Sequence, residues 1–331
     1  MGIRVAAAVV LSLLPALVAC STVDDAAQPV ATRHGIAVWG DSMSSRYPRY
    51  LQEMMPESTI YNGGVSGEFS GSVAVRQGGV VAAFRVESGA LPTSGEAGLA
   101  FTNEDRGWAS EYPGIRLGWQ PNEASPMPGT LAGVHGTLTA YAEGTEESIR
   151  FGFTPDKPGE AAPVGEDVTF VPDSAEAQAE AVHIIMVGRN NPQNVGDVLE
   201  DIASMVAATS DDRYLILSTI NATDEGEGSG ATYSRIVEGI NQGLAETYGE
   251  QYLDVRRLLI QEGLDRAGIS PTPADRADIA ADTVPTSLRV PNDVVHLSFA
   301  DPPQIGQKSG DEVLAELVHE KLIDLGWAEP A

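Results

Sequence analysis

Two distant stretches of the sequence contain the residue types that nucleophilic catalysis needs. Asp41 and Ser42 follow a glycine in "GIAVWGDSMSS", and Asp293 and His296 are the first and last residues of "DVVH". A serine attacks an ester when a histidine removes its proton and a carboxylate orients that histidine. Of the five histidines, His296 alone follows an aspartate by three residues, a spacing that brings a carboxylate beside an imidazole ring. These positions are therefore candidates for a serine nucleophile, its base and its acid.

The stretch "GIAVWGDSMSS" on its own also fits an ordinary turn, because Gly, Asp and Ser are common turn residues. Two more blocks favour a catalytic serine over an ordinary turn. They are "NGGVSGEFS" at 62–70 and "GRNN" at 188–191. Together with the first and last stretches, they resemble, in the same order, the four blocks of the SGNH (GDSL-type) hydrolase superfamily. The resemblance covers 35–70 and 180–327 and leaves the segment between them unexplained. The sequence contains no nucleophile elbow of the α/β-hydrolase type, no Walker-type phosphate loop and no HExxH motif.

The resemblance implies ester hydrolysis through an acyl-enzyme, with neither a metal nor an organic cofactor. In this interpretation Ser42 is the nucleophile, His296 is the general base, and Asp293 orients the imidazole. The oxyanion donors are the backbone N–H groups of Ser42 and Gly67 and the side-chain amide of Asn190. A bare glycine suits this role because the main chain can approach the developing negative charge closely.

Residues around these blocks depart from the family pattern or have open interpretations. Asn191 stands where an aspartate is usual, the terminal block lacks the common glycine after its aspartate, and Phe69 stands where a small hydroxyl residue is frequent. These departures leave the predicted triad intact. Arg189 is a candidate for contact with an anionic or hydroxyl-rich substrate, or for a surface salt bridge. We expect Glu68 to be a solvated turn residue and Asp41 to brace the loop that presents the serine.

The pattern of apolar residues indicates an α/β fold. Continuous apolar runs of strand length occur at 182–188 and 213–219, and apolar residues recur at helical spacing in 195–209. Strands that alternate with helices indicate a parallel sheet covered on both faces. The resemblance implies the three-layer α/β/α, flavodoxin-like arrangement of the SGNH hydrolase fold. Helical periodicity is missing from 72–175, where short alternating runs predict an inserted, small β-rich domain.

The N-terminal residues predict export and lipid attachment. Arg4 precedes an apolar run that is too short to span a membrane and ends at Cys20, the sole cysteine. The run resembles a bacterial lipobox, although an ordinary signal peptide with a nearby cysteine is the alternative. The predicted organisation is a signal peptide at 1–19, a tether at 20–34, a hydrolase domain at 35–71 and 176–331, and the insert at 72–175. We expect the protein in the cell envelope, held by its lipid anchor, which carries palmitate-type chains, on the outer face of the cytoplasmic membrane.

The composition and the predicted location narrow the substrate classes. A net charge of −27 argues against nucleic acid as a partner. The leading hypothesis is an esterase that removes O-acetyl or other short acyl groups from a cell-wall or other polysaccharide, so the partner is an acylated carbohydrate. Surface anchoring, a β insert that could bind glycan, and the lack of a long apolar segment for an acyl chain favour it. The alternatives are a membrane-surface lipase or lysophospholipase, and a non-catalytic glycan-binding protein on a hydrolase scaffold.

Overall fold

The structure, a computed structural model, describes residues 35–102, 124–142, 149–157, 159, 162–165, 167–223, 226–299 and 306–330. The predicted signal peptide, Cys20 and the whole of the predicted tether precede these ranges, so the expectations about them lie outside the described residues. Within the described ranges, no helix combines the length and apolar character needed to cross a membrane.

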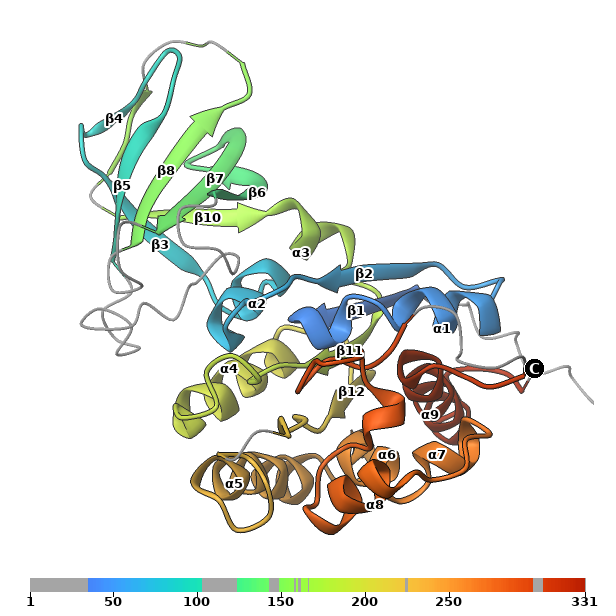
Figure 1. The fold of residues 1–331 in the computed structure, drawn as a ribbon. Coiled ribbons are helices and arrows are strands. Elements are labelled where there is room, and N and C mark those ends of the chain that lie inside the picture. The colour runs from blue at the N-terminus through green and yellow to red at the C-terminus, as the bar shows by residue number, and fades with distance from the viewer. Residues whose placement is uncertain are drawn as a thin grey trace, which may run out of the picture. The chain divides into compact units, whose positions relative to one another are not determined.

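A five-stranded parallel sheet forms the centre of the α/β part (Figure 1). Its order is β13-β12-β11-β1-β2, which is the 2-1-3-4-5 order of flavodoxin-like doubly wound sheets read from the other edge. The strands are β1 (Ile36–Gly40), β2 (Ile60–Gly64), β11 (Val182–Met186), β12 (Tyr214–Leu217) and β13 (Tyr252–Leu253). Every residue of β1 and β11 is buried, as expected for strands covered on both faces.

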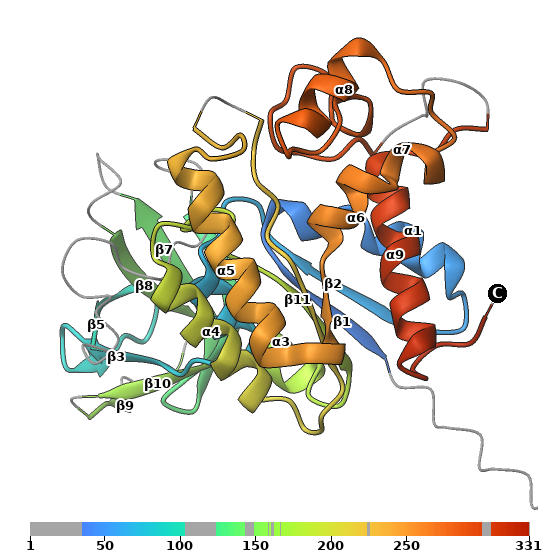
Figure 2. The same cartoon turned by 90° about the horizontal axis from the view of Figure 1, so that it is seen from below.

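Helices pack on both faces of this sheet, which gives three layers (Figure 2). Along β1, Ala37 and Trp39 join one hydrophobic cluster, and Ile36 and Val38 join the other, because successive strand side chains point to opposite faces. The first cluster includes residues of α2 (Ser70–Gln77), α4 (Val195–Ala207) and α5 (Thr232–Tyr248). The second includes residues of α1 (Pro48–Met54), α6 (Val255–Gln261), α7 (Gly263–Arg266) and α9 (Gly310–Asp324).

The remaining regular elements of the α/β part are short. They are α8 (Pro273–Ala280) and the 3₁₀ turns η1 (Ser42–Ser44), η3 (Gly249–Gln251) and η4 (Thr286–Leu288). α8 begins with a capping box, in which Thr272 and Asp275 exchange hydrogen bonds between side chain and backbone. η1 and η4 matter for the site, since one carries Ser42 and the other precedes the loop of Asp293 and His296.

A closed antiparallel barrel of six strands occupies most of the segment between β2 and β11. Its order is β10-β3-β5-β8-β7-β6, and β6 pairs with β10 to close it. The strands are β3 (Ala82–Val86), β5 (Ala97–Phe101), β6 (Ala124–Leu131), β7 (Val134–Ala142), β8 (Ile149–Pro155) and β10 (Val168–Pro172). A small ladder of β4 (Ala90–Leu91) and β9 (Ala162–Pro163) and the helix α3 (Asp173–Ala177) complete the segment.

The sequence-based expectations for the fold hold at the level of architecture. The parallel α/β sheet is present, and the segment without helical periodicity contains the antiparallel barrel. One hydrophobic cluster contains residues of both parts, among them Trp39 of β1 and Phe84 of β3. Helix α2 spans the predicted boundary at residue 72, and α3 spans the one at 175. The exact domain limits therefore stay a prediction.

Candidate active site

Three loops of the candidate site begin at the carboxyl ends of three neighbouring strands. β1 ends at Gly40, β2 at Gly64 and β11 at Met186, and the order β2-β1-β11 sets these strands side by side. Ligand sites of open parallel sheets lie at this edge. A Cβ atom on Gly40 would lie 2.1 Å from Ser44 Oγ and 2.3 Å from Met186 O, so only glycine fits there. Because Gly40 has no side chain, the Ser42–Ser44 turn can pack closely against the carboxyl edge of the sheet.

The Ser42 hydroxyl, the His296 ring and the Asp293 carboxylate form one continuous chain of hydrogen bonds. Ser42 Oγ lies 2.9 Å from His296 Nε2, and Asp293 Oδ2 lies 2.8 Å from His296 Nδ1. Because an ionised carboxylate can only accept hydrogen bonds, Nδ1 carries the ring proton and Nε2 accepts from the serine hydroxyl. The structure thus brings together the three residues that the sequence predicted as a triad. This geometry can pass the serine proton to Nε2 while the carboxylate stabilises the imidazolium.

The loop of Asp293 and His296 fixes its own carboxylate. Asp293 Oδ1 accepts the backbone N–H groups of Val295 and His296, both at 2.8 Å, and Val290 N–H donates to the carbonyl of His296 at 2.9 Å. Partial burial acts to raise the pKa of Asp293, but these backbone hydrogen bonds and the His296 ring outweigh it and lower the pKa to about 2. The carboxylate is therefore ionised, and oriented toward the ring, throughout the neutral range.

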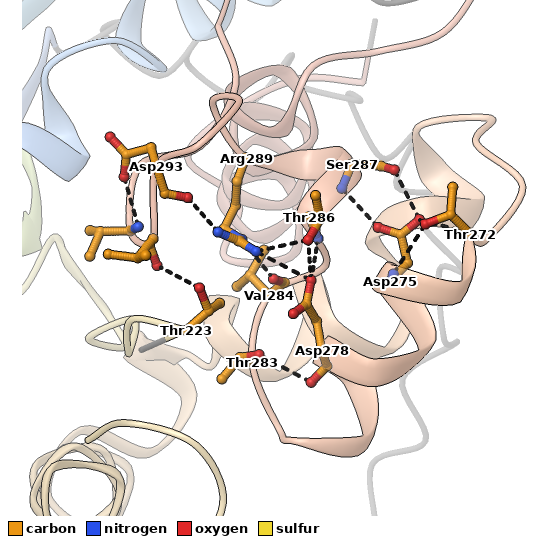
Figure 3. A network of polar contacts seen from close by, with 12 residues as sticks. Thr223, Thr272, Asp275, Asp278, Thr283, Val284, Thr286, Ser287, Arg289 and Asp293 are labelled. Atoms are coloured by element: carbon orange, nitrogen blue, oxygen red, sulfur yellow. Dashed lines mark hydrogen bonds and ion pairs between the residues drawn. The ribbon is translucent and has the colours of Figure 1, made fainter. Parts of the chain in front are cut away.

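Arg289 ties this loop to the segment that precedes it (Figure 3). Its guanidinium donates to the backbone carbonyl of Asp293 and, through Nε, to the carbonyl of Val284 at 3.1 Å. Nη2 donates to Thr286 Oγ1 at 2.9 Å and to Asp278 Oδ2 at 3.2 Å. The Arg289 side chain is 8% exposed, so these bonds form largely out of contact with water. Asp293, the predicted triad acid, is thereby held by a network that sequence reasoning missed.

The predicted oxyanion donors lie on the loops after β2 and β11. Gly67 has φ = +78°, in the left-handed region that favours glycine. Asn190 Nδ2 donates to the backbone carbonyl of Glu68 at 3.0 Å, and its amide has a second N–H for another acceptor. In the part of the chain that the structure describes, no acceptor takes up the backbone N–H of Ser42 or Gly67. These N–H groups are therefore free to bind a ligand.

Asn191 joins the segment after β11 to the first residue of α2. Its Oδ1 accepts the backbone N–H of Ser70 at 3.2 Å, and its Nδ2 donates to Ser70 Oγ at 2.9 Å. Ser70 Oγ in turn donates to Asp201 Oδ2 on α4 at 2.6 Å. An amide can both accept and donate, which a carboxylate cannot, and this explains how asparagine satisfies the position here.

Asp41 caps the turn that carries Ser42, the predicted nucleophile. Its Oδ1 accepts the backbone N–H of Met43 at 2.9 Å, which confirms the bracing contact expected from the sequence. Burial raises the pKa of Asp41 to about 6, although the hydrogen bond from Met43 N–H and the nearby Arg189 guanidinium act to lower it. A buried acid with this pKa changes its protonation state within the mildly acidic range.

Arg189 forms an ion pair, as one of its two sequence interpretations anticipated. Its Nη1 and Nη2 each donate to one oxygen of Glu227, both at 2.6 Å. Glu227 also accepts the backbone N–H of Ala222 at 2.6 Å. The two side chains are 16% and 7% exposed, so the pair is largely buried instead of lying on the surface. It connects the loop after β11 with the segment before α5, and the role of Arg189 toward substrate stays a prediction.

The expectation that Glu68 is a solvated turn residue is wrong. Glu68 is 2% exposed, and its carboxylate pairs with Arg76 of α2 at 2.6 Å. The error has a physical origin, because "SGEFS" is a polar segment and the partner that buries Glu68 lies eight residues later on a helix. Arg76 is the sole charged residue of α2, but only the structure shows that every residue of that helix is buried. A lone arginine on such a helix requires a buried partner.

Two other features of the described residues lie apart from these loops. No group of three or more His, Cys, Asp or Glu side chains in the described ranges is placed to hold a metal ion. A cavity of about 440 Å³ is lined by residues of α1, α7, α9 and the segment before α9, namely Met54, Arg266, Lys308, Glu316, His319 and Glu320. None of the predicted site residues lines it.

Comparison with known proteins gives weak likenesses. No protein-family model matches this sequence, and no curated protein matches it either. Among solved structures, a Streptococcus pneumonia protein named for platelet activating factor has a TM-score of 0.39 at 14% identity, over 90% of this chain and 86% of that chain. The C-terminal catalytic domain of Streptococcus pneumoniae peptidoglycan O-acetyltransferase A has a TM-score of 0.38 at 14% identity, over 88% and 94%. A peptidoglycan O-acetylesterase has a TM-score of 0.36 at 13% identity, over 88% and 91%. Likenesses at these TM-scores carry no argument, so the functional interpretation rests on this chain's own geometry.

Proposed function

We propose that this protein is a serine esterase of the SGNH type that hydrolyses carboxylic esters through an acyl-enzyme. The observation that carries the proposal is the hydrogen-bonded chain from Ser42 through His296 to Asp293. Support comes from its place at the carboxyl edge of a parallel sheet, where the strand order matches the flavodoxin-like order. The free backbone N–H groups and the amide of Asn190 supply the second requirement, donors for an oxyanion.

The reaction follows from the atoms in place. Ser42 Oγ attacks the ester carbonyl carbon while its proton moves to His296 Nε2, and the carbonyl oxygen becomes an oxyanion held by N–H donors of Ser42, Gly67 and Asn190. Collapse breaks the bond to the alcohol oxygen, which takes the proton from Nε2. Water then attacks the acyl-enzyme by the same route, and the carboxylic acid leaves. Asp293 stays ionised throughout, since its pKa is about 2.

The proposed substrates are O-acetyl or other short-acyl esters on a cell-wall or other polysaccharide. The interior of the six-stranded barrel supports this choice, because it is filled by its own side chains. Phe84, Leu131, Leu138 and Phe153 are each 0% exposed, and Phe170 is 2% exposed. A barrel interior packed in this way offers no room for a long acyl chain.

An ester panel tests the proposal directly. The purified protein is assayed with nitrophenyl esters from acetate to laurate and with an acetylated polysaccharide, and Ser42→Ala is the matched inactive variant. We expect the highest kcat/KM for acetate and release of acetate from the polysaccharide, both lost in Ser42→Ala. A rate that rises with chain length would instead identify the membrane-surface lipase or lysophospholipase. Failure of a fluorophosphonate to label Ser42 would favour the non-catalytic glycan-binding protein.

We also propose that the chain is a lipoprotein attached through Cys20 to the outer face of the cytoplasmic membrane. The support is the sequence alone, in which an apolar run ends at the single cysteine. The full chain expressed in a bacterium with radiolabelled palmitate should incorporate the label, and Cys20→Ser should not. Incorporation that persists in Cys20→Ser would contradict the anchor.

A further inference from the structure

A buried ion pair joins Glu68, in the loop after β2, to Arg76 of α2, close to the ends of β1 and β2. Arg76 Nε lies 3.0 Å and 2.8 Å from the two carboxylate oxygens of Glu68, and its Nη2 lies 2.6 Å from Oε2. The same Nη2 donates to the backbone carbonyl of Gly63 at 2.8 Å and to that of Gly40 at 3.4 Å. Arg76 is 8% exposed and Glu68 is 2% exposed, so water contributes little to these contacts. One guanidinium thus binds β1, β2 and the loop after β2.

Glu68 also connects this guanidinium to the loop after β11. Its side chain binds Arg76, while its backbone carbonyl accepts the amide of Asn190 at 3.0 Å. Glu68 directly follows Gly67, and Gly40 lies two residues before Ser42. All three candidate oxyanion donors are therefore within two residues of, or hydrogen-bonded to, groups that the ion pair fixes.

Stability alone is a poor reason for such a pair. Burying two charges costs desolvation free energy, and well-packed apolar residues of similar volume often serve the fold as well. The planar guanidinium offers something that apolar side chains lack, which is several N–H donors in a fixed geometry. Here those donors meet a carboxylate and the terminal carbonyls of adjacent strands. The backbone hydrogen bonds between β1 and β2 end where the strands end, so they cannot hold the loops that follow. The Arg76 guanidinium holds those loops at fixed distances from each other.

We propose that Glu68 and Arg76 are positioning residues that hold the oxyanion donors of Ser42, Gly67 and Asn190 at the spacing the tetrahedral intermediate needs. The inference rests on the proposed esterase function. Neither side chain touches the reacting atoms. They act through the main chain of Gly40, Gly63 and Glu68 and through the amide of Asn190.

The test compares substrate binding with binding of a tetrahedral mimic. In the double variant Glu68→Gln/Arg76→Met both charges are removed together, so no buried charge is left without a partner. We expect kcat on nitrophenyl acetate to fall about 10- to 100-fold, with KM within about twofold, since misplaced donors weaken the transition state and not the bound ester. The inhibition constant of an alkylboronic acid, which forms a tetrahedral adduct with the serine, should rise by a similar factor. The pH dependence of kcat should keep the native acid limb, since His296 is untouched.

A single variant covers the case in which the double variant does not fold. Arg76→Lys keeps the charge, but one ammonium group cannot contact both carboxylate oxygens and two carbonyls at once. We expect it to show the same loss in kcat and boronate affinity, at a smaller factor. The control is Arg266→Met/Glu320→Gln, which makes the same two kinds of substitution in the ion pair between α7 and α9. This variant should behave like the native protein.

The outcomes separate this proposal from the one on which it rests. Native kcat and boronate affinity in the double variant, or in Arg76→Lys if the double variant is unfolded, overturn the positioning role and leave the esterase intact. A change in KM alone also overturns it, because donors for the oxyanion act after the ester has bound. A native protein that neither hydrolyses esters nor reacts with a fluorophosphonate overturns both proposals together.

Discussion

The two sides of Ser42 are built in opposite ways. On the acid–base side, Asp293 and His296 lie three residues apart on one loop, and each contacts the next member of the triad directly. On the oxyanion side, the proposed donors belong to three loops, after β1, β2 and β11. Two of these loops are joined by the hydrogen bond between Asn190 and Glu68, which lie 122 residues apart in the sequence. The first side is held by short-range contacts, and the second by buried polar groups that bridge between elements.

This difference shows that side chains close in sequence and loops distant in sequence are positioned by different kinds of hydrogen bond. A carboxylate three residues before a histidine finds the ring, and the backbone N–H groups of its own loop, within one turn. Loops from separate strands have no such proximity, so the chain uses groups with several donors or acceptors, such as Arg76 and Asn191. The predictions below change each side in turn.

The largest effect is expected where the acid–base side is broken. In Asp293→Asn the side chain can no longer accept from His296 Nδ1–H with the strength of a carboxylate, so the ring tautomer that activates Ser42 is lost. We expect kcat to fall about 10³- to 10⁴-fold while the protein stays folded. Steady-state kinetics on nitrophenyl acetate and the far-UV circular dichroism spectrum measure this. A loss below tenfold would show that Asp293 does not orient the base.

A smaller loss is expected on the oxyanion side, because several donors share the charge. Asn190→Ala removes one of them, and we expect kcat to fall about 10²- to 10³-fold with little change in KM. Asn194→Ala is the matched control, since Asn194 precedes α4 on the same segment and its side chain makes no capping hydrogen bond. Equal kinetics of the two variants would exclude an oxyanion role for Asn190.

The contrast between local and long-range contacts also decides how much of the fold and of the site could be predicted from the sequence. The spacing of Asp293 and His296 is visible in the sequence, and the strand periodicity around "GDS" and "GRNN" places both blocks at strand ends. Parallel neighbours bring those ends together, so the sequence alone places Ser42 and Asn190 at the same edge of the sheet. The α/β sheet follows from the same periodicity, and α4 forms where apolar residues recur at helical spacing.

The supports of the site could not be predicted, because their partners are distant and nothing local marks them. Glu68 sits in a polar stretch that reads as solvated until Arg76 is placed against it, and Ser70 reaches Asp201 across 131 residues. Arg289 lies four residues before Asp293, yet its contacts depend on the fold of η4 and α8. The barrel was predicted as β-rich, but its closure depends on β6 pairing with β10 across the segment.

The support of the acid–base loop should matter less than the triad itself. Arg289→Lys keeps the charge but cannot reach Asp293 O, Val284 O, Thr286 and Asp278 together. Because Asp293 keeps its own backbone hydrogen bonds, we expect kcat to fall only about tenfold, alongside a loss of about 1–3 kcal/mol in unfolding free energy from unmet buried groups. Urea denaturation and kinetics on the same sample measure both. A loss as large as that of Asp293→Asn would mean that the loop cannot hold its carboxylate alone.

The smallest effect is expected at Asp41, which lies beside Ser42 and contributes to both sides through one turn. Burial raises its pKa to about 6, so between about pH 4 and 6 the unfolded chain ionises this group while the folded protein keeps it neutral. The unfolded state then binds fewer protons, and the contribution of Asp41 to the unfolding free energy declines as the pH rises through this window. Asp41→Asn keeps the acceptor for Met43 N–H and removes the ionisation.

Urea denaturation of both proteins at pH 4 and pH 7 measures this linkage. The variant should gain stability relative to the native protein on going from pH 4 to pH 7, with no further gain at pH 8. A stability difference that does not change with pH would show that Asp41 ionises in the folded protein as readily as in the unfolded chain. In that case the turn that presents Ser42 carries a fixed negative charge, and the free N–H groups of Ser42 and Gly67 must stabilise an oxyanion against it. The neutral form of Asp41 that we expect below its pKa of about 6 removes that opposing charge from the turn.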